Sequence, residues 1–233
     1  MVGTMRDPIN RYLDAAILVP ETTRDGFEKA VDTCLGLEVF SVCVRPCDIE
    51  RAQALCRGSS TAVCVVLGFP HGSQLSGSKA DEARRYLAMG VDEIDMVANY
   101  GWARSGLWDE VRADIAGVAG LTRAADVPLK VIFETAQLDP RTISRLVGIC
   151  VEAGADFVKT STGFNGAGAS EEDVKRMLEA ADGRIKVKAS GGIRDRDRAG
   201  RFLDLGVHRL GVNWSSCVTI CTGGGLPPAG GTY

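Results

Sequence analysis

Lys159 stands at the end of a short apolar segment, where a lysine is unusual. Residues 156–158 indicate the end of a buried strand, and the small polar residues Thr160, Ser161 and Thr162 follow. Burying an ammonium group without a partner is costly, so we expect the pKa of Lys159 to fall below its ordinary value of about 10.4. A lysine with a lowered pKa is a nucleophile at neutral pH. The alternative is a lysine that extends from a strand end into solvent.

Three further charged residues stand at the ends of predicted strands: Asp95, Glu134 and Lys188. If Lys188 faces Lys159, its positive charge disfavours a second one nearby, which is one way to activate an amine. Asp95 could move protons through a water molecule. For each of these residues taken alone, a structural ion pair is the alternative. Lysines at the ends of two consecutive strands nevertheless favour chemistry centred on an amine.

A glycine-rich turn predicts a binding site for an anion. Ser190, Gly191 and Gly192 precede a helix that is expected to begin near Asp195. Backbone N–H groups and the helix N-terminus could therefore bind a phosphate group there. Gly163, in the loop after the first lysine, also allows a ligand to approach the backbone closely. The alternative for the two adjacent glycines is an ordinary turn.

Strand and helix patterns alternate along the chain, and eight strands are expected. Their positions are residues 13–19, 39–44, 61–67, 93–97, 129–133, a short strand at 157, 185–188 and 209–212. A helix follows each strand except the last, because residues 217–225 show no clear helix. Eight such units close into a parallel (β/α)₈ (TIM) barrel, whose strand ends carry the chemistry of barrel enzymes. An open doubly wound sheet is the alternative, but its Gly-x-Gly-x-x-Gly turn is missing.

The composition is that of one α/β domain. The chain has 233 residues, of which 45% are hydrophobic and 24% are charged, and no linker divides it. We therefore expect a single domain over residues 1–233. It would comprise a short helical lead-in at 6–12, the barrel at about 13–216 and a flexible tail at about 222–233.

Charge and cysteine usage exclude several classes of function. The net charge of −3 provides no basic stripe for nucleic acid. No apolar run of about 18 residues and no signal peptide is present, so we expect a cytoplasmic protein without a membrane span. The eight cysteines are spread through apolar segments, which indicates reduced core thiols. No Cys-x-x-Cys occurs, and His71 and His208 have no ligand-like spacing, so no metal is predicted.

Five motifs resemble the deoxyribose-phosphate aldolase family. They are Asp-Phe-Val-Lys-Thr-Ser-Thr-Gly-Phe, Val-Lys-Ala-Ser-Gly-Gly-Ile-Arg, Asp-Glu-Ile-Asp-Met-Val, Leu-Lys-Val-Ile-Phe-Glu-Thr and Gly-Phe-Pro-His-Gly. The resemblance covers residues from about 13 to 212. It implies a class I aldolase with a (β/α)₈ barrel that needs no metal or organic cofactor. Such an enzyme reversibly cleaves 2-deoxy-D-ribose 5-phosphate to D-glyceraldehyde 3-phosphate and acetaldehyde.

The resemblance also implies residue roles. Lys159 would form the Schiff base, while Lys188 lowers its pKa and joins Asp95 in proton transfer. Asp14 would help to hold this network. The phosphate end of the substrate would be bound by Gly163, Gly191, Gly192 and Arg194. Some members end in a tail whose last tyrosine reaches the site, so Tyr233 is a candidate for proton transfer, and an incidental tyrosine is the alternative.

Two departures from the family pattern leave alternatives open. Asp14 is followed by Ala15 and Ala16, so a hydroxyl near the substrate is missing, and the last strand leaves either Asn213 or Ser215 to face the phosphate. The chain could therefore be the aldolase, a sugar-phosphate-binding barrel that has lost catalysis, or a Schiff-base aldolase for another phosphosugar or longer aldehydes. We expect phosphosugars and aldehydes as partners, and barrel aldolases suggest a homodimer.

Overall fold

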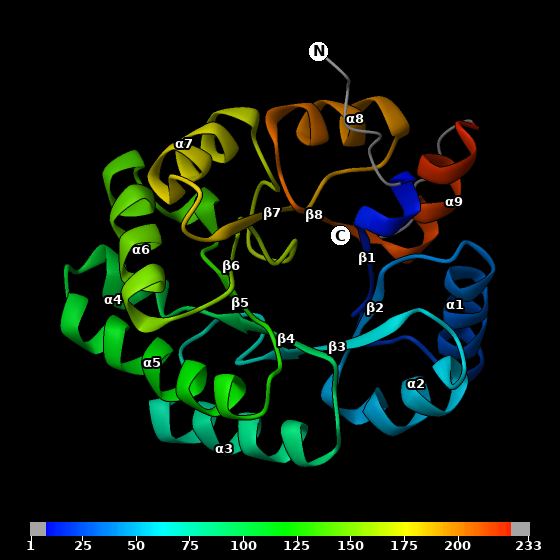
Figure 1. The fold of residues 1–233 in the computed structure, drawn as a ribbon, viewed down its shortest axis with the longest axis horizontal. Helices are drawn as coiled ribbons and strands as arrows, with labels where there is room; N and C mark the ends of the chain where they lie inside the picture. The colour runs from blue at the N-terminus through cyan, green and yellow to red at the C-terminus, as the bar shows by residue number, and fades with distance from the viewer. Residues whose placement is uncertain (1–7, 225–233) are drawn as a thin grey trace.

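The computed structural model describes residues 8–224, and the features below concern that part of the chain. Its strands are parallel and close into a barrel in sequence order, with β1 paired to β8 (Figure 1). The strands are β1 Leu13–Ile17, β2 Ser41–Val44, β3 Ala62–Leu67, β4 Glu93–Val97, β5 Leu129–Ile132, β6 Phe157–Lys159, β7 Lys186–Ser190 and β8 Arg209–Asn213. The predicted (β/α)₈ barrel is confirmed, while most of the expected tail lies outside the described residues.

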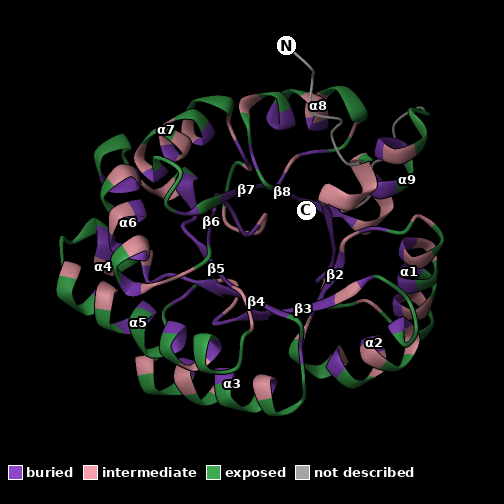
Figure 2. Cartoon of the chain, in the orientation of Figure 1, coloured by how far each residue is buried: buried purple, intermediate pink, exposed green. Residues whose placement is uncertain are grey.

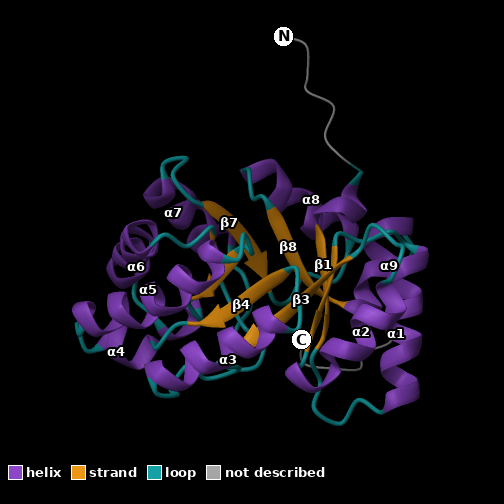
Figure 3. Cartoon of the chain, turned by 60° about the horizontal axis from the view of Figure 1, so that its bottom comes forward, coloured by secondary structure: helices purple, strands orange, loops and turns teal. Residues whose placement is uncertain are grey.

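The helices form a ring around this barrel (Figures 1 and 3). They are α1 Arg24–Gly36, α2 Ile49–Cys56, α3 Ser76–Ala88, α4 Tyr100–Arg104, α5 Trp108–Ala124, α6 Pro140–Ala153, α7 Glu171–Ala181, α8 Arg196–Leu205 and α9 Trp214–Thr222. Short 3₁₀ helices occur at η1 Ile9–Tyr12, η2 Pro46–Asp48 and η3 Thr135–Gln137. The strands are buried, and the outer faces of the helices are exposed (Figure 2).

Local sequence signals set the ends of several helices. Asp139 begins α6, because its carboxylate accepts a hydrogen bond from the N–H of Thr142 at 2.9 Å and Pro140 occupies the first turn. Gly154 ends the same helix with a φ of 81°, a conformation that glycine adopts without strain. These short-range signals explain why the alternation of strands and helices can be predicted from the sequence.

The expectation that residues 217–225 lack a helix is wrong, because α9 spans Trp214–Thr222. Asn213 begins this helix by accepting a hydrogen bond from the N–H of Ser215, and Gly223 ends it with a φ of 71°. Its valine, threonine and isoleucine residues have low helix propensity and gave no helical signal. Packing against β1, α1 and α8 stabilises the helix instead.

None of the helices within residues 8–224 has the length and apolarity that a membrane span requires.

A buried ion pair outside the barrel fixes the end of β4. Lys79 on α3 donates hydrogen bonds to Asp114 on α5 at 2.6 Å and to the backbone carbonyl of Val97 at 3.1 Å. Lys79 and Asp114 are both buried. The end of the strand that carries Asp95 is therefore held by two helices.

Candidate active site

A network of charged side chains fills the middle of the barrel. Alternate residues of a strand point to the same face, and the inward positions of six strands carry acids or bases here. We call the following residues the barrel network: Asp14 from β1, Glu93 and Asp95 from β4, Lys130 from β5, Lys159 from β6, Lys188 from β7 and Arg209 from β8. All of them are buried, although charged residues are seldom buried unless they are paired.

Asp95 is the centre of this network. Its Oδ2 accepts hydrogen bonds from Nζ of Lys159 and Nζ of Lys188, each at 2.8 Å, and its Oδ1 accepts one from Lys130 at 2.8 Å. The two nitrogens on Oδ2 therefore cannot lie farther apart than twice that distance. The structure thus brings together Asp95, Lys159 and Lys188, which the sequence placed at separate strand ends. Their catalytic roles remain predictions.

Asp14 holds the other side of Lys188. Its Oδ2 lies 2.5 Å from Nζ of Lys188, while its Oδ1 accepts hydrogen bonds from Arg209 and Ser41, each at 2.7 Å. Burial raises the pKa of the Asp14 carboxyl, but Lys188, Arg209 and Lys130 together hold that pKa well below its ordinary value. Asp14 is therefore an ionised carboxylate at neutral pH.

Burial and neighbouring opposite charges also set the pKa values of Asp95 and of its lysine partners. Burial raises the pKa of Asp95, but the adjacent Lys130, Lys159 and Lys188 hold that pKa well below its ordinary range. Burial lowers the pKa of Lys188, yet the carboxylates of Asp14 and Asp95 outweigh burial and raise that pKa. The pKa of Lys130 is raised in the same way, against burial, mainly by Asp95. These groups keep their charges over a wide range of pH.

Three members of the barrel network were not anticipated from the sequence: Glu93, Lys130 and Arg209. Lys130 Nζ lies 2.7 Å from Glu93, and Arg209 contacts Glu93 and Asp14. The sequence did hold a signal for Glu93, because this residue lies two residues before Asp95 and therefore on the same strand face. Lys130 lies beside Asp95 in the register of β4 and β5, but only the paired strands reveal that register.

The loops after β6 and β7 lie side by side and carry the glycines predicted to bind phosphate. Gly163, Gly191 and Gly192 have φ values of 85°, 89° and 73°, which glycine adopts readily. A Cβ on Gly191 would lie 3.7 Å from the Cα of Gly163 and 2.9 Å from the Cα of Gly168. The buried hydroxyl of Ser161 has no hydrogen-bond partner among the described residues. This edge of the barrel offers polar groups that a bound ligand could engage.

Two of the other residues assigned to the site, Arg194 and Ser215, lie within the described part of the chain. Arg194 is exposed. Ser215 lies in the first turn of α9, where its N–H and its hydroxyl donate hydrogen bonds to Oδ1 of Asn213 at 3.0 and 2.8 Å. A phosphate contact by either Asn213 or Ser215 remains a prediction. Tyr233 lies outside the described residues, so its role remains a prediction.

Glu134, noted above only as a charged strand end, is buried and positions the loop after β6. Its φ is 57°, a conformation that non-glycine residues seldom adopt. Its carboxylate accepts hydrogen bonds from the backbone N–H and the hydroxyl of Thr162 and from the side-chain amide of Asn165. Asn165 also donates a hydrogen bond to the carbonyl of Pro70 at 2.8 Å. Glu134 thus links three loops at one end of the barrel.

A separate group of residues in the barrel is apolar. Ala16, Cys43, Cys64 and Val66 form a buried group with Leu18, and Phe69 and Phe164 pack against it. A cavity of about 440 Å³ adjoins this group and is lined by residues that include Leu18, Val66, Phe69 and Phe164. Because Ala16 belongs to this group, the missing hydroxyl leaves an apolar wall here.

Comparison with known proteins identifies the family. The model of the DeoC/LacD aldolase family matches residues 25–206. The deoxyribose-phosphate aldolase of Lactiplantibacillus plantarum is 42% identical over 90% of this chain and 98% of its own length. That of Brevibacillus brevis is 41% identical over 92% and 96%.

Among solved structures, the deoxyribose phosphate aldolase of Aeropyrum pernix, described as a unique tetramer, is 28% identical. It aligns with a TM-score of 0.84 over 91% of this chain and 89% of its own. The family match covers most of the barrel, including both lysine motifs. The chain therefore belongs to the DeoC/LacD family of aldolases.

Proposed function

We propose that this protein is a class I aldolase that reversibly cleaves 2-deoxy-D-ribose 5-phosphate to D-glyceraldehyde 3-phosphate and acetaldehyde. The observation that carries the proposal is the sharing of one Asp95 oxygen by the side-chain nitrogens of Lys159 and Lys188. The names of the relatives support the choice of substrate. The reaction uses a lysine amine and requires no metal or organic cofactor.

Charge balance in the barrel network supports a neutral amine at Lys159. Among the described residues, the network holds three carboxylates (Asp14, Glu93 and Asp95) and four basic side chains (Lys130, Lys159, Lys188 and Arg209). If all seven groups are ionised, one positive charge is left over in a buried site, which is costly. The pKa values of Lys130, Lys188 and Arg209 are raised, against burial, by their carboxylate partners. We propose that Lys159, the remaining base of the network, supplies the neutral amine.

The first half of the cleavage makes the Schiff base. The unprotonated Nζ of Lys159 attacks C1 of the open-chain sugar, and the resulting carbinolamine loses water to form an iminium ion. Lys188 and Asp95 lie beside this nitrogen and transfer the protons that these steps require. The neighbouring charge of Lys188 also favours the neutral form of Lys159 before attack.

The second half breaks the carbon–carbon bond. A base removes the proton of the C3 hydroxyl, the C2–C3 bond breaks, and its electron pair moves to the iminium nitrogen to give an enamine. Glyceraldehyde 3-phosphate leaves, C2 of the enamine takes up a proton, and water hydrolyses the new iminium ion. Acetaldehyde and free Lys159 result. The Asp95–Lys188 pair supplies and accepts the protons at the nitrogen end of the substrate.

The phosphate end of the substrate would lie at the glycine loops. The backbone at Gly163, Gly191 and Gly192 allows a phosphate to approach closely. The hydroxyl of Ser161 would satisfy its hydrogen-bonding capacity by contacting the substrate. Holding the phosphate orients the reacting carbon atoms toward Lys159.

A second candidate function is a Schiff-base aldolase for aldehydes with an apolar chain. It is favoured by the apolar wall at Ala16 and Val66 and by the cavity of about 440 Å³ that adjoins it. The complete lysine and aspartate arrangement argues against a barrel that only binds sugar phosphates. A panel of acceptor aldehydes separates the two aldolases: faster turnover with longer apolar aldehydes than with glyceraldehyde 3-phosphate would favour the second.

Trapping the Schiff base tests the mechanism directly. The protein is treated with acetaldehyde and borohydride, and its peptides are analysed by mass spectrometry. We expect an adduct of about 28 Da, the mass of a reduced acetaldehyde imine, on Lys159. Lys159→Met should lose both the adduct and retro-aldol turnover, whereas Lys175→Met on α7 should retain them. Turnover in the Lys159→Met variant would refute the proposal.

The cellular location and assembly are also proposed. Composition supports action in the cytoplasm, and fluorescence of a tagged protein in cells would test it. The tetramer described for the Aeropyrum pernix relative supports a homo-oligomer of two or more copies. Light scattering at several concentrations distinguishes a monomer from such an assembly.

A further inference from the structure

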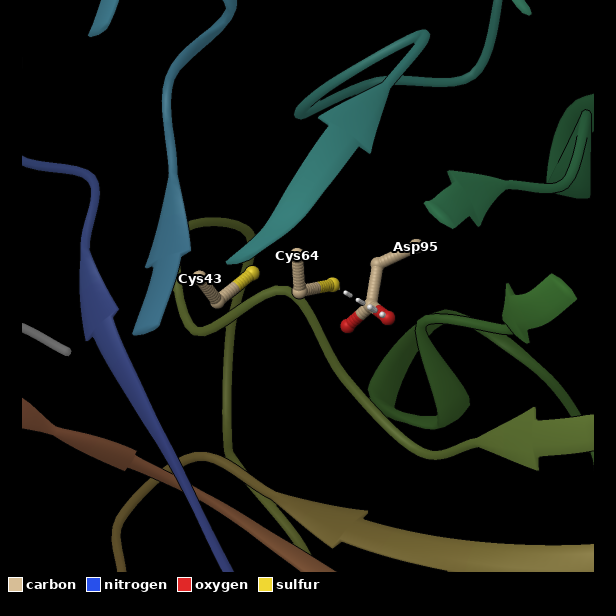
Figure 4. A group of neighbouring side chains, drawn as sticks. All are labelled: Cys43, Cys64 and Asp95. Atoms are coloured by element: carbon tan, nitrogen blue, oxygen red, sulfur yellow. Dashed lines mark hydrogen bonds between the residues drawn. The ribbon is translucent and has the colours of Figure 1, made fainter. Parts of the chain in front are cut away.

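Two cysteines and one aspartate lie together on three neighbouring strands inside the barrel. Cys43 on β2 is paired in register with Cys64 on β3, and Asp95 follows on β4 (Figure 4). Their two sulfur atoms and one carboxylate oxygen all lie within 4.8 Å of one another. The thiol of Cys64 donates a hydrogen bond to Oδ1 of Asp95 at 3.2 Å. The mechanism proposed above uses neither thiol.

We propose that Cys43, Cys64 and Asp95 form an inhibitory site for a thiophilic divalent cation, Zn²⁺ or Cd²⁺. Two thiolates and one carboxylate are ligands that Zn²⁺ accepts, with a fourth position left for water. Two sulfur atoms bound to one Zn²⁺ lie about 3.8 Å apart, since each Zn–S bond is about 2.3 Å long. Side chains whose ligand atoms already lie within 4.8 Å reach that geometry by small rotations.

Charge does not prevent a cation from entering this lysine-rich site. Thiols lose their protons when they bind a metal, so two thiolates offset the two charges of the cation. The net charge of the surroundings is therefore unchanged by binding. Burial raises the pKa of the Cys64 thiol well above its ordinary value, and the positive charge of Lys130, whose Nζ lies 3.4 Å from the sulfur, opposes this only in part. The bound cation itself must therefore displace the thiol proton.

Binding a cation here would stop the amine chemistry. Asp95 is the residue whose oxygens hold Lys159, Lys188 and Lys130. A carboxylate that coordinates a divalent cation no longer attracts those lysines as strongly. Leu18 and Val66, which belong to the same buried group as Cys43 and Cys64, line the cavity of about 440 Å³, and the cation would approach through that cavity. The inhibition, but not the binding, rests on the proposed aldolase function.

The test follows binding and activity separately. The reduced protein is titrated with Cd²⁺ while thiolate-to-Cd²⁺ charge-transfer absorption and retro-aldol turnover are recorded. We expect one cation to bind per chain and turnover to fall in parallel. Cys43→Ala and Cys64→Ala should each weaken Cd²⁺ binding by at least about tenfold, because each removes one of three ligands. Turnover of each variant is compared with its own value without metal.

Other cysteines provide the controls. Cys47 is exposed, and Cys34 is buried outside the barrel interior on α1. Cys47→Ser and Cys34→Ala should leave both the absorption and the inhibition unchanged. Cys64→Ser retains a hydroxyl beside Asp95 but lacks the thiol. Circular dichroism of this variant shows whether it is folded, so that weaker Cd²⁺ binding can be attributed to the lost thiol and not to misfolding.

Three results would overturn the proposal. The first is undiminished Cd²⁺ absorption in both Cys43→Ala and Cys64→Ala, and the second is no absorption in the unaltered protein. The third is inhibition that persists in these variants while the absorption is lost, which would place the inhibitory cation elsewhere. Absorption that behaves as expected in a protein without retro-aldol turnover would instead refute the aldolase function and retain the cation site.

Discussion

The contacts of the two Asp95 oxygens influence the charge state of each neighbouring lysine. The side-chain nitrogens of three lysines share the two oxygens of Asp95, and Asp14 contacts Lys188 from the other side. Asp14 and Asp95 together hold Lys188 as an ammonium, and Asp95 also contacts Nζ of Lys159. We propose Lys159 as the nucleophile and Lys188 as its charged neighbour.

Gly211 leaves the room that Lys188 needs. A Cβ at this inward position of β8 would lie 2.6 Å from the hydroxyl of Ser190 and 3.1 Å from Cε of Lys188. We expect Gly211→Ala to lower the free energy of unfolding by about 1–3 kcal/mol, as overpacking does in a core. It should also lower kcat, because Lys188 must move. Urea unfolding and steady-state kinetics measure the two effects.

Gly117 provides the matched control. It lies exposed on α5, and a Cβ there would meet nothing within 4 Å. Gly117→Ala should raise the stability by up to about 1 kcal/mol, because alanine favours the helix, and should leave kcat unchanged. Equal kinetics for the Gly211 variant and the unaltered protein would show that Lys188 tolerates the extra methyl group.

At the scale of elements, loops after different strands must be held in one arrangement. The loop after β6 carries Gly163, and its neighbours Thr162 and Asn165 both donate hydrogen bonds to Glu134 after β5. The loop after β7 is held against it by hydrogen bonds from the N–H of Ala169 to the carbonyls of Ser190 and Gly191. The edge that is predicted to bind phosphate therefore depends on contacts between loops as well as on the glycines.

Replacing Glu134 tests this role. Glu134→Ala removes a charged acceptor and leaves buried donors unpaired, which costs about 1.5–3 kcal/mol. We expect KM for 2-deoxyribose 5-phosphate to rise at least about tenfold, with a smaller rise for unphosphorylated 2-deoxyribose. Glu134→Gln keeps one acceptor oxygen, so its KM should lie between the KM of the unaltered protein and that of Glu134→Ala. An equal rise in KM for both sugars would show that Glu134 does not act through the loop that is predicted to bind phosphate.

At the scale of the whole molecule, the barrel network links stability to pH. The folded-state pKa values of Asp14 and Asp95 lie below the unfolded value of about 3.9. Their contribution to stability is therefore complete above about pH 5 and is lost as the pH falls through the folded values. The folded-state pKa values of Lys130 and Lys188 lie above about 10.4. Their contribution is complete below that pH and is lost as the pH rises through the folded values.

Unfolding measurements across pH test this linkage. The free energy of unfolding should be nearly constant from about pH 5 to 9 and should fall on both sides. Asp14→Asn should have a shallower slope between about pH 3 and 5, because one carboxylate with a lowered pKa is gone. Asp109→Asn, at a position where the side chain is 93% exposed, is the surface control. An unchanged slope in Asp14→Asn would contradict the linkage.

The sequence by itself determined the barrel and part of the site. Periodic apolar segments and helix ends such as Asp139 and Gly154 depend on neighbouring residues, so the alternation of strands and helices was predictable. The motifs around Lys159 and Lys188 also indicated amine chemistry. The weak helix α9 was missed, because tertiary packing rather than local propensity stabilises it.

Only the tertiary structure decided which distant residues meet. Lys130 faces Asp95, and Cys43 lies beside Cys64, because closing the barrel sets the register of neighbouring strands. The sequence search for metal ligands relied on local spacing and could not join Cys43, Cys64 and Asp95. A shift of one residue in register would turn each inward side chain outward. The charge balance at Lys159 is therefore a property of the closed barrel, which no single segment of the chain contains.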